Sequence, residues 1–349
     1  MPIRPNALER ALFFSLNLGP APILDIWGGV AFRVVVAAVR LGIFEALADA
    51  PLTARTLADR IGTDPDGTSH LLQAIESLGY VRRRSEAYVL TPMTRKWLLR
   101  RSGHFGPGFE FWASNLYTLM GDLEASIRTG TPRRNLYAWI EDQPEVSRAF
   151  QEWMVAIAGF AGGTIVNLVA RRVPHNAERL LDIGGGHGQY ALAFCRRFPR
   201  LRATVLDSPR ALESARASID HAEMADRVTT LAGDVLMDPL GEGYDVALMF
   251  NVNHGFTEAQ NQALVHRTAR ALRSGGLLVV AEQLSGSTAS PVVNATNALL
   301  GLSYFHLLGG RLYARDDVAR WLTTAGFTRL RRLDSPRLPG MSLMMGVRH

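Results

Sequence analysis

The stretch Arg179-Leu180-Leu181-Asp182-Ile183-Gly184-Gly185-Gly186-His187-Gly188 decides the fold of this chain. Its apolar first half is typical of a buried strand, and residues 189–198 after it have helical patterning. The glycines between allow a tight turn and let a ligand approach the main chain without meeting a Cβ atom. In a doubly wound sheet, such a turn at the carboxyl end of the first strand is a nucleotide-binding position. The stretch therefore predicts a Rossmann-like α/β domain.

Two details of the turn select its ligand. Gly184, Gly186 and Gly188 follow a G-x-G-x-G spacing, whereas dinucleotide enzymes have G-x-G-x-x-G. Asp182 lies two residues before the first of these glycines. A carboxylate there repels a pyrophosphate but suits a ligand that carries an amino group and a sulfonium. We therefore expect the turn to bind S-adenosylmethionine, with S-adenosylhomocysteine as the product.

Two more acids end the next predicted strands. Asp207 lies at the tip of the second strand, where an acid accepts hydrogen bonds from both ribose hydroxyls. Asp234 lies at the tip of the third, where it can accept from the adenine amino group while Val235 packs on the purine. Singly, each acid is typical of a cap or turn, and NAD would also use Asp207. Only S-adenosylmethionine gives Asp182 a role as well.

From residue 179 onwards, short apolar segments alternate with helical ones, which is the pattern of a parallel sheet covered by helices on both faces. The predicted strands are 180–183, 203–206, 228–232, 245–250 and 277–282. Two further strands, 328–333 and 342–347, flank a proline-rich turn. We expect them to form a C-terminal antiparallel hairpin, which suits methyltransferases better than dehydrogenases.

The N-terminal part has another pattern. Three helical segments precede two short strands, an order typical of a winged helix; the segments are 31–48, 53–61, 64–78, 80–84 and 87–91. We expect a winged-helix domain over residues 1–105 and a catalytic domain over 106–349. Within the latter, residues 106–173 are expected to be all-helical. Aromatic residues of this segment, including Trp112 and Phe160, are candidates for lining an apolar substrate pocket.

Composition narrows the class of protein. The net charge of +6 comes mostly from dispersed arginines, which are typical of a solvated surface and not of a nucleic-acid footprint. A single cysteine, Cys195, excludes an intrachain disulfide and fits a reducing cytoplasm. The apolar stretch 23–48 is interrupted by charged residues, so we expect no membrane span there. We expect a cytoplasmic protein without nucleic-acid or membrane partners.

The fourth predicted strand runs into Phe250-Asn251-Val252-Asn253-His254-Gly255-Phe256. The tips of strands four and five face the transferred methyl group in such a fold, so His254 is a candidate general base. The alternative is a histidine that caps the helix near Thr257. Glu282 ends strand five and can orient His254 or stabilise its charged form; the alternative is a surface glutamate. Asn251, at the strand tip, is a candidate for contacting the cofactor.

His306 is the other histidine of interest. On a helix that lines the substrate cavity it could contact the substrate, or bind a metal together with His254. Two histidines without a nearby carboxylate are a weak metal signal, so we expect no metal and favour a hydrogen-bonded cavity histidine.

Together these residues resemble the plant-type, caffeate-type small-molecule O-methyltransferases, class I S-adenosylmethionine-dependent enzymes, and their bacterial natural-product branch. The matching words are Asp182–Gly188, Asp207, Gly233-Asp234, His254, Leu272–Gly276, Glu282, and Gly309-Gly310 before Asp316-Asp317. The resemblance covers nearly the whole chain. It implies that the winged-helix part is a dimerisation domain, so the expected partners are a second copy of the chain and a small-molecule acceptor.

The resemblance also implies roles for residues of the site. Gly184, Gly186, Asp207 and Asp234 would hold the cofactor, and Phe256 would stack near adenine where the family has tryptophan. His254 would be the base and Glu282 its partner. Met154 matches a methionine that lines the acceptor pocket.

Three positions depart from the family pattern. Gly255 replaces an aspartate after the histidine, Leu312 replaces a second glutamate, and Phe250 replaces a lysine. The base therefore has fewer acidic supports. Either the acceptor is already acidic, or the reaction is not ordinary O-methylation.

The leading hypothesis is a homodimeric methyltransferase (EC 2.1.1.-) that methylates a hydroxyl or phenol of a hydrophobic secondary metabolite, with His254 as base. One alternative is a C-methyltransferase, since some C-methylating relatives use a metal. Another is a family member that has lost methylation activity. A ligand-sensing DNA-binding regulator is a remote alternative, because helix 69–78 is poor in basic residues.

Overall fold

The computed structural model describes residue 3 and residues 5–102, 105–286 and 288–349. The chain forms two compact units. Unit 1 comprises Met1–Thr118 and Arg148–Ala156, and unit 2 comprises Leu119–Ser147 and Ile157–His349. The helices between residues 106 and 173 therefore belong partly to each unit.

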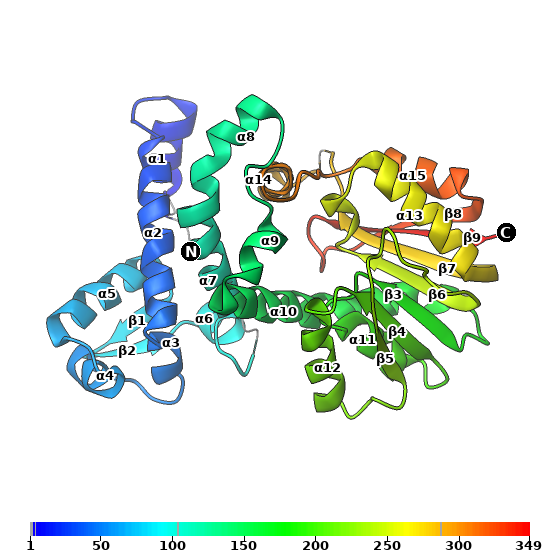
Figure 1. The fold of residues 1–349 in the computed structure, drawn as a ribbon. Coiled ribbons are helices and arrows are strands. Elements are labelled where there is room, and N and C mark those ends of the chain that lie inside the picture. The colour runs from blue at the N-terminus through cyan, green and yellow to red at the C-terminus, as the bar shows by residue number, and fades with distance from the viewer. Residues whose placement is uncertain (1–2, 4, 103–104, 287) are drawn as a thin grey trace. The chain divides into compact units, whose positions relative to one another are not determined.

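Unit 1 is a helical domain with a small antiparallel hairpin (Figure 1). Its elements are α1 (Ala7–Arg10), the π-helical turn η1 (Ala11–Ser15), α2 (Ile23–Arg40), α3 (Ile43–Ala46), α4 (Ala54–Ile61), α5 (Pro65–Ser77), β1 (Val81–Arg84), β2 (Ala87–Leu90), α6 (Pro92–Trp97) and α7 (Gly106–Ser114). The π-helical turn η2 (Asn115–Leu119) follows α7. The core of the unit is formed by buried side chains such as Leu57, Leu72, Ile75 and Tyr88.

Local sequence accounts for most helix boundaries in unit 1. The side chain of Asp64 accepts a hydrogen bond from the Gly67 N–H, and Pro65 occupies the first turn of α5. The predicted helix 31–48 differs from the structure. Helix α2 begins earlier, at Ile23, and ends before Gly42, whose φ of 71° only glycine adopts easily and which starts the separate helix α3.

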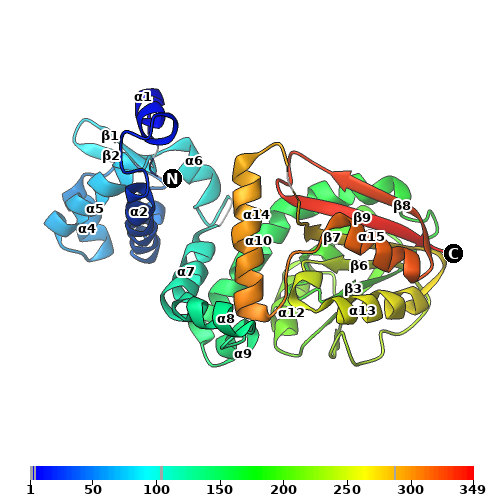
Figure 2. The same ribbon diagram turned by 90° about the horizontal axis from the view of Figure 1, so that it is seen from above.

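Unit 2 is built on a seven-stranded sheet in the order β5-β4-β3-β6-β7-β9-β8. The strands are β3 (Arg179–Ile183), β4 (Arg202–Asp207), β5 (Val228–Ala232), β6 (Tyr244–Phe250), β7 (Leu272–Gln283), β8 (Phe327–Asp334) and β9 (Met341–Arg348). Strands β3 to β7 run parallel, whereas β9 pairs antiparallel with both β7 and β8. Figure 2 shows β8 and β9 side by side. The predicted doubly wound sheet with a C-terminal antiparallel hairpin is confirmed.

Helices cover both faces of this sheet. The helical elements after η2, not all of which lie on the sheet, are η3 (Met120–Asp122), α8 (Leu123–Thr129), α9 (Leu136–Glu141), α10 (Pro144–Val169), η4 (Ala170–Arg172), α11 (Gln189–Arg197), α12 (Ala211–His221), η5 (Asn253–Gly255), α13 (Glu258–Ala271), α14 (Pro291–Leu308) and α15 (Arg315–Thr324). One core joins the sheet to α11, α12 and the end of α10; a second joins its other face to α13 and α15 (Figure 1).

One helix, spanning Pro144–Arg172, is long and apolar enough to cross a membrane, with a mean hydropathy of 1.7 and a third of the apolar window buried. Its side chains Ala158, Ala161, Ile165 and Val169 lie in the core of unit 2. A core helix of a globular domain has the same length and composition, so these features are weak support for a membrane span.

Candidate active site

The glycine-rich turn connects β3 to α11 at the carboxyl edge of the sheet. Gly184, Gly186 and Gly188 all have positive φ, at 67°, 43° and 71°. A Cβ atom on Gly184 would lie 2.6 Å from the Cγ2 atom of Val252, so this position has neither the backbone conformation nor the space for a side chain. The turn thus leaves bare main chain at the strand tips.

Asp182 is the buried acid that precedes this turn. Its side chain is 1% exposed, and neither carboxylate oxygen has a hydrogen-bond partner among the described residues. Burial, with a smaller contribution from the nearby Asp207 charge, raises the pKa of Asp182 to about 7, and the backbone amide of Ala191 partly opposes this shift. A buried carboxylate without a partner fits the positively charged amino group of S-adenosylmethionine.

Asp207 ends β4 and is fixed by backbone donors. Its Oδ2 atom accepts a hydrogen bond from the Gly186 N–H (2.8 Å), and its Oδ1 atom accepts one from the Ser208 N–H (2.7 Å). Burial raises the pKa of Asp207, while these two hydrogen bonds lower it. The bond to Gly186 ties the tip of the second strand of the fold to the glycine turn.

The third acid, Asp234, is exposed and begins a short loop after β5. Its Oδ1 atom accepts from the Leu236 N–H (2.7 Å). Arg267 of α13 anchors this loop. Its guanidinium donates hydrogen bonds to the carbonyls of Val235 (2.8 Å), Leu236 and Asp238. Val235 itself is 9% exposed. These hydrogen bonds define the shape of the loop.

His254 and Glu282 form the polar centre of the site. The Nδ1 atom of His254 lies 2.9 Å from Oε2 of Glu282, and both side chains are buried. The other carboxylate oxygen accepts from the backbone N–H groups of Val252 (2.6 Å) and Asn253 (2.7 Å). An ionised carboxylate only accepts hydrogen bonds, so the Nδ1 atom carries a proton and Nε2 is left as the basic nitrogen.

Two tyrosines that no sequence pattern singled out belong to this centre. The ring of Tyr304, on α14, stacks on the imidazole of His254 with 3.9 Å between ring centroids and 10° between planes. Tyr137, on α9, is 47% exposed as a whole residue, and burial of its hydroxyl together with the charges of Asp207 and Glu282 raises its pKa to about 12. Tyr304 lies two residues from His306, but nothing in that spacing indicates a contact with His254.

Two further residues predicted from the sequence are His306 and Asn251. His306 is hydrogen-bonded at both ring nitrogens, to the Ser126 hydroxyl and the Leu119 carbonyl, each at 2.9 Å. Neither nitrogen is left for a metal, and the described residues contain no group of three or more His, Cys, Asp or Glu side chains that could hold one. Asn251 adopts a left-handed conformation (φ 54°) at the tip of β6. Its cofactor role stays a prediction.

The pocket residues expected from the sequence fall in both units. Trp112 and Met154 are partly buried in unit 1, and Phe160 is 44% exposed in unit 2. Phe256 packs partly on the core beneath α13. Their roles in binding an acceptor or adenine stay predictions.

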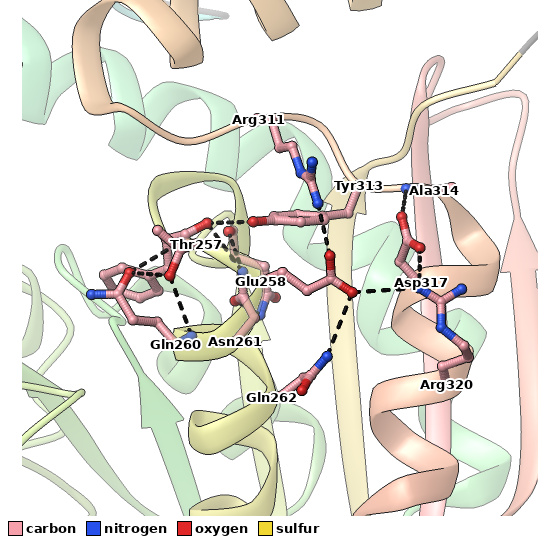
Figure 3. A network of polar contacts seen from close by, with 12 residues as sticks. Thr257, Glu258, Gln260, Asn261, Gln262, Arg311, Tyr313, Ala314, Asp317 and Arg320 are labelled. Atoms are coloured by element: carbon pink, nitrogen blue, oxygen red, sulfur yellow. Dashed lines mark hydrogen bonds and ion pairs between the residues drawn. The ribbon is translucent and has the colours of Figure 1, made fainter. Parts of the chain in front are cut away.

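A segment of six residues, Gly309–Ala314, contacts the turn that carries His254; we call it the strap, and Figure 3 shows its residues Arg311, Tyr313 and Ala314. The Arg311 N–H donates to the carbonyl of His254 (3.1 Å), and the Tyr313 hydroxyl donates to the carbonyl of Phe256 (2.6 Å). The guanidinium of Arg311 pairs with Glu258 at 2.9 Å, and Glu258 also lies 3.5 Å from Arg320. The strap therefore joins η5 to α13 and α15.

Comparison with known proteins places this geometry in context. Residues 124–328 match the model of an O-methyltransferase domain, and residues 26–100 match that of an O-methyltransferase dimerisation domain. The chain is 29% identical to the 3-hydroxy-5-methyl-1-naphthoate 3-O-methyltransferase of Streptomyces sahachiroi over 327 residues, covering 92% of this chain and 94% of that protein. It is 26% identical to the L-tyrosine C(3)-methyltransferase of Streptomyces lavendulae over 329 residues, with coverages of 89% and 88%.

The fold is also similar to solved structures. The human N-acetylserotonin methyltransferase, crystallised with S-adenosylmethionine, superposes with a TM-score of 0.82 at 20% identity, covering 100% of this chain and 99% of that one. At this identity the likeness shows the fold alone.

Proposed function

Because this chain belongs to the O-methyltransferase family and is an S-adenosylmethionine-dependent methyltransferase of small molecules, we propose that it methylates a hydroxyl or phenol of a hydrophobic secondary metabolite, with His254 as the general base. The observation that carries the proposal is the His254–Glu282 pair. Glu282 is fixed by two backbone donors and orients the imidazole so that Nε2 can take the acceptor proton.

The residues at the strand tips fit the cofactor. Asp182 would bind its amino group, Asp207 its ribose hydroxyls, and the loop from Asp234 to Val235 its adenine. When bound, S-adenosylmethionine supplies an electrophilic methyl group on its sulfonium. The protein contributes alignment, exclusion of water and a place for the acceptor proton, which are the main demands of a displacement at carbon.

The acceptor is proposed to be apolar and aromatic. The Streptomyces sahachiroi relative acts on a hydroxylated naphthoate, by its name. Trp112, Met154, Phe160 and Phe256 are proposed to line the acceptor and adenine sites. The stacking of Tyr304 on His254 supports an aromatic pocket beside the base.

We also propose a cytoplasmic homodimer that forms through residues 1–105. The match of residues 26–100 to a dimerisation domain supports self-association. Large apolar side chains of the N-terminal helices are exposed in the single chain, among them Leu8, Phe14, Ile26 and Trp27.

Replacing the base tests the function directly. We expect His254→Ala to lower methyl transfer to phenolic and naphtholic acceptors at least about a hundredfold, since a positioned base contributes about that much. Calorimetric binding of S-adenosylhomocysteine should persist in this variant. His221→Ala removes an exposed histidine on α12 and serves as the matched control. An unchanged rate in His254→Ala would remove the base from the mechanism.

C-methylation is the second candidate, favoured by the similarity to an L-tyrosine C(3)-methyltransferase and by the missing acids at Gly255 and Leu312. The methyl carbon chemical shift of the product distinguishes a methoxy group from a ring methyl group. Turnover that a chelator abolishes and a divalent metal restores would favour a metal-assisted C-methyltransferase.

A further inference from the structure

We propose that Tyr304 is a positioning residue for the base: its ring holds the plane of the His254 imidazole and stabilises the imidazolium formed when the acceptor loses its proton. This inference rests on the proposed role of His254. The two rings are nearly parallel, and their centroids are 3.9 Å apart, which is face-to-face contact.

Tyr304 is held in place by a well-anchored helix. Helix α14 begins after Ser290, whose hydroxyl accepts from the Val293 N–H, and ends at Gly309, which has a φ of 73°. Two residues beyond Tyr304, the buried His306 bonds to the Ser126 hydroxyl and the Leu119 carbonyl. The helix cannot rotate without breaking both bonds, so the ring of Tyr304 has a fixed position.

The imidazole is thereby restrained from three directions. Glu282 binds its Nδ1 edge at 2.9 Å, Tyr304 covers one ring face, and the strap donates the Arg311 N–H to the main-chain carbonyl at 3.1 Å. A hydrogen bond through one nitrogen still allows the ring to rock about that bond. The stacked ring opposes this motion and keeps Nε2 aimed in one direction.

The stack also has an electrostatic consequence. The face of an aromatic ring carries negative charge density and attracts a cation placed over it. The protonated imidazole is such a cation, whereas the neutral imidazole is not. Tyr304 remains a neutral phenol, because burial and the charge of Glu282 raise its pKa. It therefore favours the protonated state of the base without adding a charge of its own.

The surroundings make this contribution matter. Among the residues that the structure describes, the ionisable groups that bear on the pair include Glu282 on β7, Tyr304 on α14, Tyr137 on α9 and Tyr190 on α11. The guanidinium of Arg311 points to Glu258 instead. Gly255 and Leu312 occupy positions where the family resemblance implies acids. Glu282 and the tyrosine ring are thus the supports left to the imidazolium.

An NMR titration tests the proposal without an acceptor. The imidazoles of the full-length protein are labelled with 13C and 15N, and the His254 signal is identified by its loss in His254→Gln. We expect Tyr304→Leu to lower the titration midpoint of that signal by about half a pH unit or more, since a cation over a ring face is worth that much. Tyr304→Phe keeps the ring and should keep the midpoint. Tyr304→Met is a second variant without a ring, should the leucine variant fold poorly.

Kinetics with an accepted phenol provide the second readout. In Tyr304→Leu we expect kcat to fall about tenfold and the acidic limb of its pH profile to move to lower pH, while S-adenosylhomocysteine still binds. An unmoved limb and midpoint in the leucine and methionine variants would overturn the proposal, as would an equal shift in Tyr304→Phe. If His254→Ala keeps its rate, the proposed base has failed. If His254→Ala loses activity but Tyr304→Leu and Tyr304→Met leave the pH profile unchanged, the proposed role of Tyr304 is wrong and the role of His254 as base stands.

Discussion

A Cβ atom at position 310 would lie 1.8 Å from the carbonyl oxygen of His254, so the close approach of these two residues requires glycine. The next residue of the strap, Arg311, donates its N–H to that same carbonyl at 3.1 Å. Both contacts act on the main chain of the base, while the Glu282 carboxylate acts on its side chain. The strap therefore determines where the base lies relative to the strand tips.

Gly310→Ala should move the base without touching the cofactor residues. The added methyl group forces the strap or η5 to shift, and misplacement of a catalytic group by about 1 Å can cost on the order of a hundredfold in rate. We expect kcat to fall at least about tenfold while the affinity for S-adenosylhomocysteine is kept. Gly163→Ala is the matched control, since a Cβ atom there meets nothing within 4 Å. Equal activity of the two variants would show that the strap can shift without displacing His254, which would contradict the prediction.

Cofactor binding should depend on pH through Asp182. Its pKa is raised to about 7 when the site is empty, and a bound ammonium group favours the carboxylate. Below pH 7 binding must therefore release a proton, and affinity should fall by up to about tenfold per pH unit. Calorimetry of S-adenosylhomocysteine in buffers of different ionisation enthalpy measures this release. Asp182→Asn should bind more weakly and release no proton; an undiminished release would place the titrating group elsewhere.

Asp182 also affects the free energy of unfolding. A rise in pH should strengthen cofactor binding but lower the stability of the protein without cofactor. Because its folded pKa lies above the ordinary value of 3.8, protonated Asp182 favours folding, and this contribution is lost as pH rises from about 4 through about 7. Asp182→Asn should then raise the free energy of unfolding at pH 8 more than at pH 5, on the order of a few kcal/mol. Urea titrations at the two pH values check the sign. If Asp182→Asn were less stable than the wild type at pH 8, the predicted sign would be wrong.

Arg267→Ala should weaken cofactor binding by loosening the loop of residues 234–238, which is proposed to bind adenine. The guanidinium ties three carbonyls of residues 235–238 to α13, so its loss frees the loop that presents Asp234 and Val235. We expect the Kd for S-adenosylhomocysteine to rise about tenfold, since one or two lost charge-assisted hydrogen bonds are worth about that much. Arg270→Ala removes an exposed arginine from the same helix and is the control. Equal affinities in both variants would assign Arg267 to stability alone.

The positions of the proposed cofactor residues at the strand tips were predictable because their signals are local in sequence. The apolar strand before Gly184 and the acids at the strand tips lie where chain order alone puts them, at one edge of a parallel sheet. His254 and Glu282 were predictable for the same reason, since they follow adjacent strands. The bounds of β5, Val228–Ala232, agree with the predicted strand at both ends.

What could not be predicted depends on packing between distant segments. Tyr304 meets His254 because α14 packs beside η5, and no periodicity in α14 indicates which of its faces does so. His306 finds its partners at Ser126 and Leu119, 180 and 187 residues earlier in the chain. The division of residues 106–173 between two units could not be predicted from the sequence. Helix α10 carries apolar side chains along its whole length, so no change in its pattern marks the boundary.

Asp245 stabilises the fold from the edge of the sheet opposite the site. It is 1% exposed at the start of β6, accepts the N–H groups of Glu178 (2.7 Å) and Arg179 (2.9 Å), and pairs with Arg273. Arg273 is 43% exposed, so only the Asp245 side of this pair is buried. A hydrogen bond to a charged group is worth about 1.5 to 3 kcal/mol, so Asp245→Asn should lower the free energy of unfolding by about that amount. Glu242→Gln, at an exposed position of the preceding loop, is the control.

Because the proposed cofactor site lies at the carboxyl ends of the strands, the folded Asp245→Asn protein should keep its affinity for S-adenosylhomocysteine. Urea unfolding and calorimetry separate the two properties. If the variant were as stable as Glu242→Gln, the hydrogen bonds from Glu178 and Arg179 would be replaceable by water. If it lost cofactor affinity while folded, the amino ends of β3 and β6 would be coupled through the strands to the glycine turn.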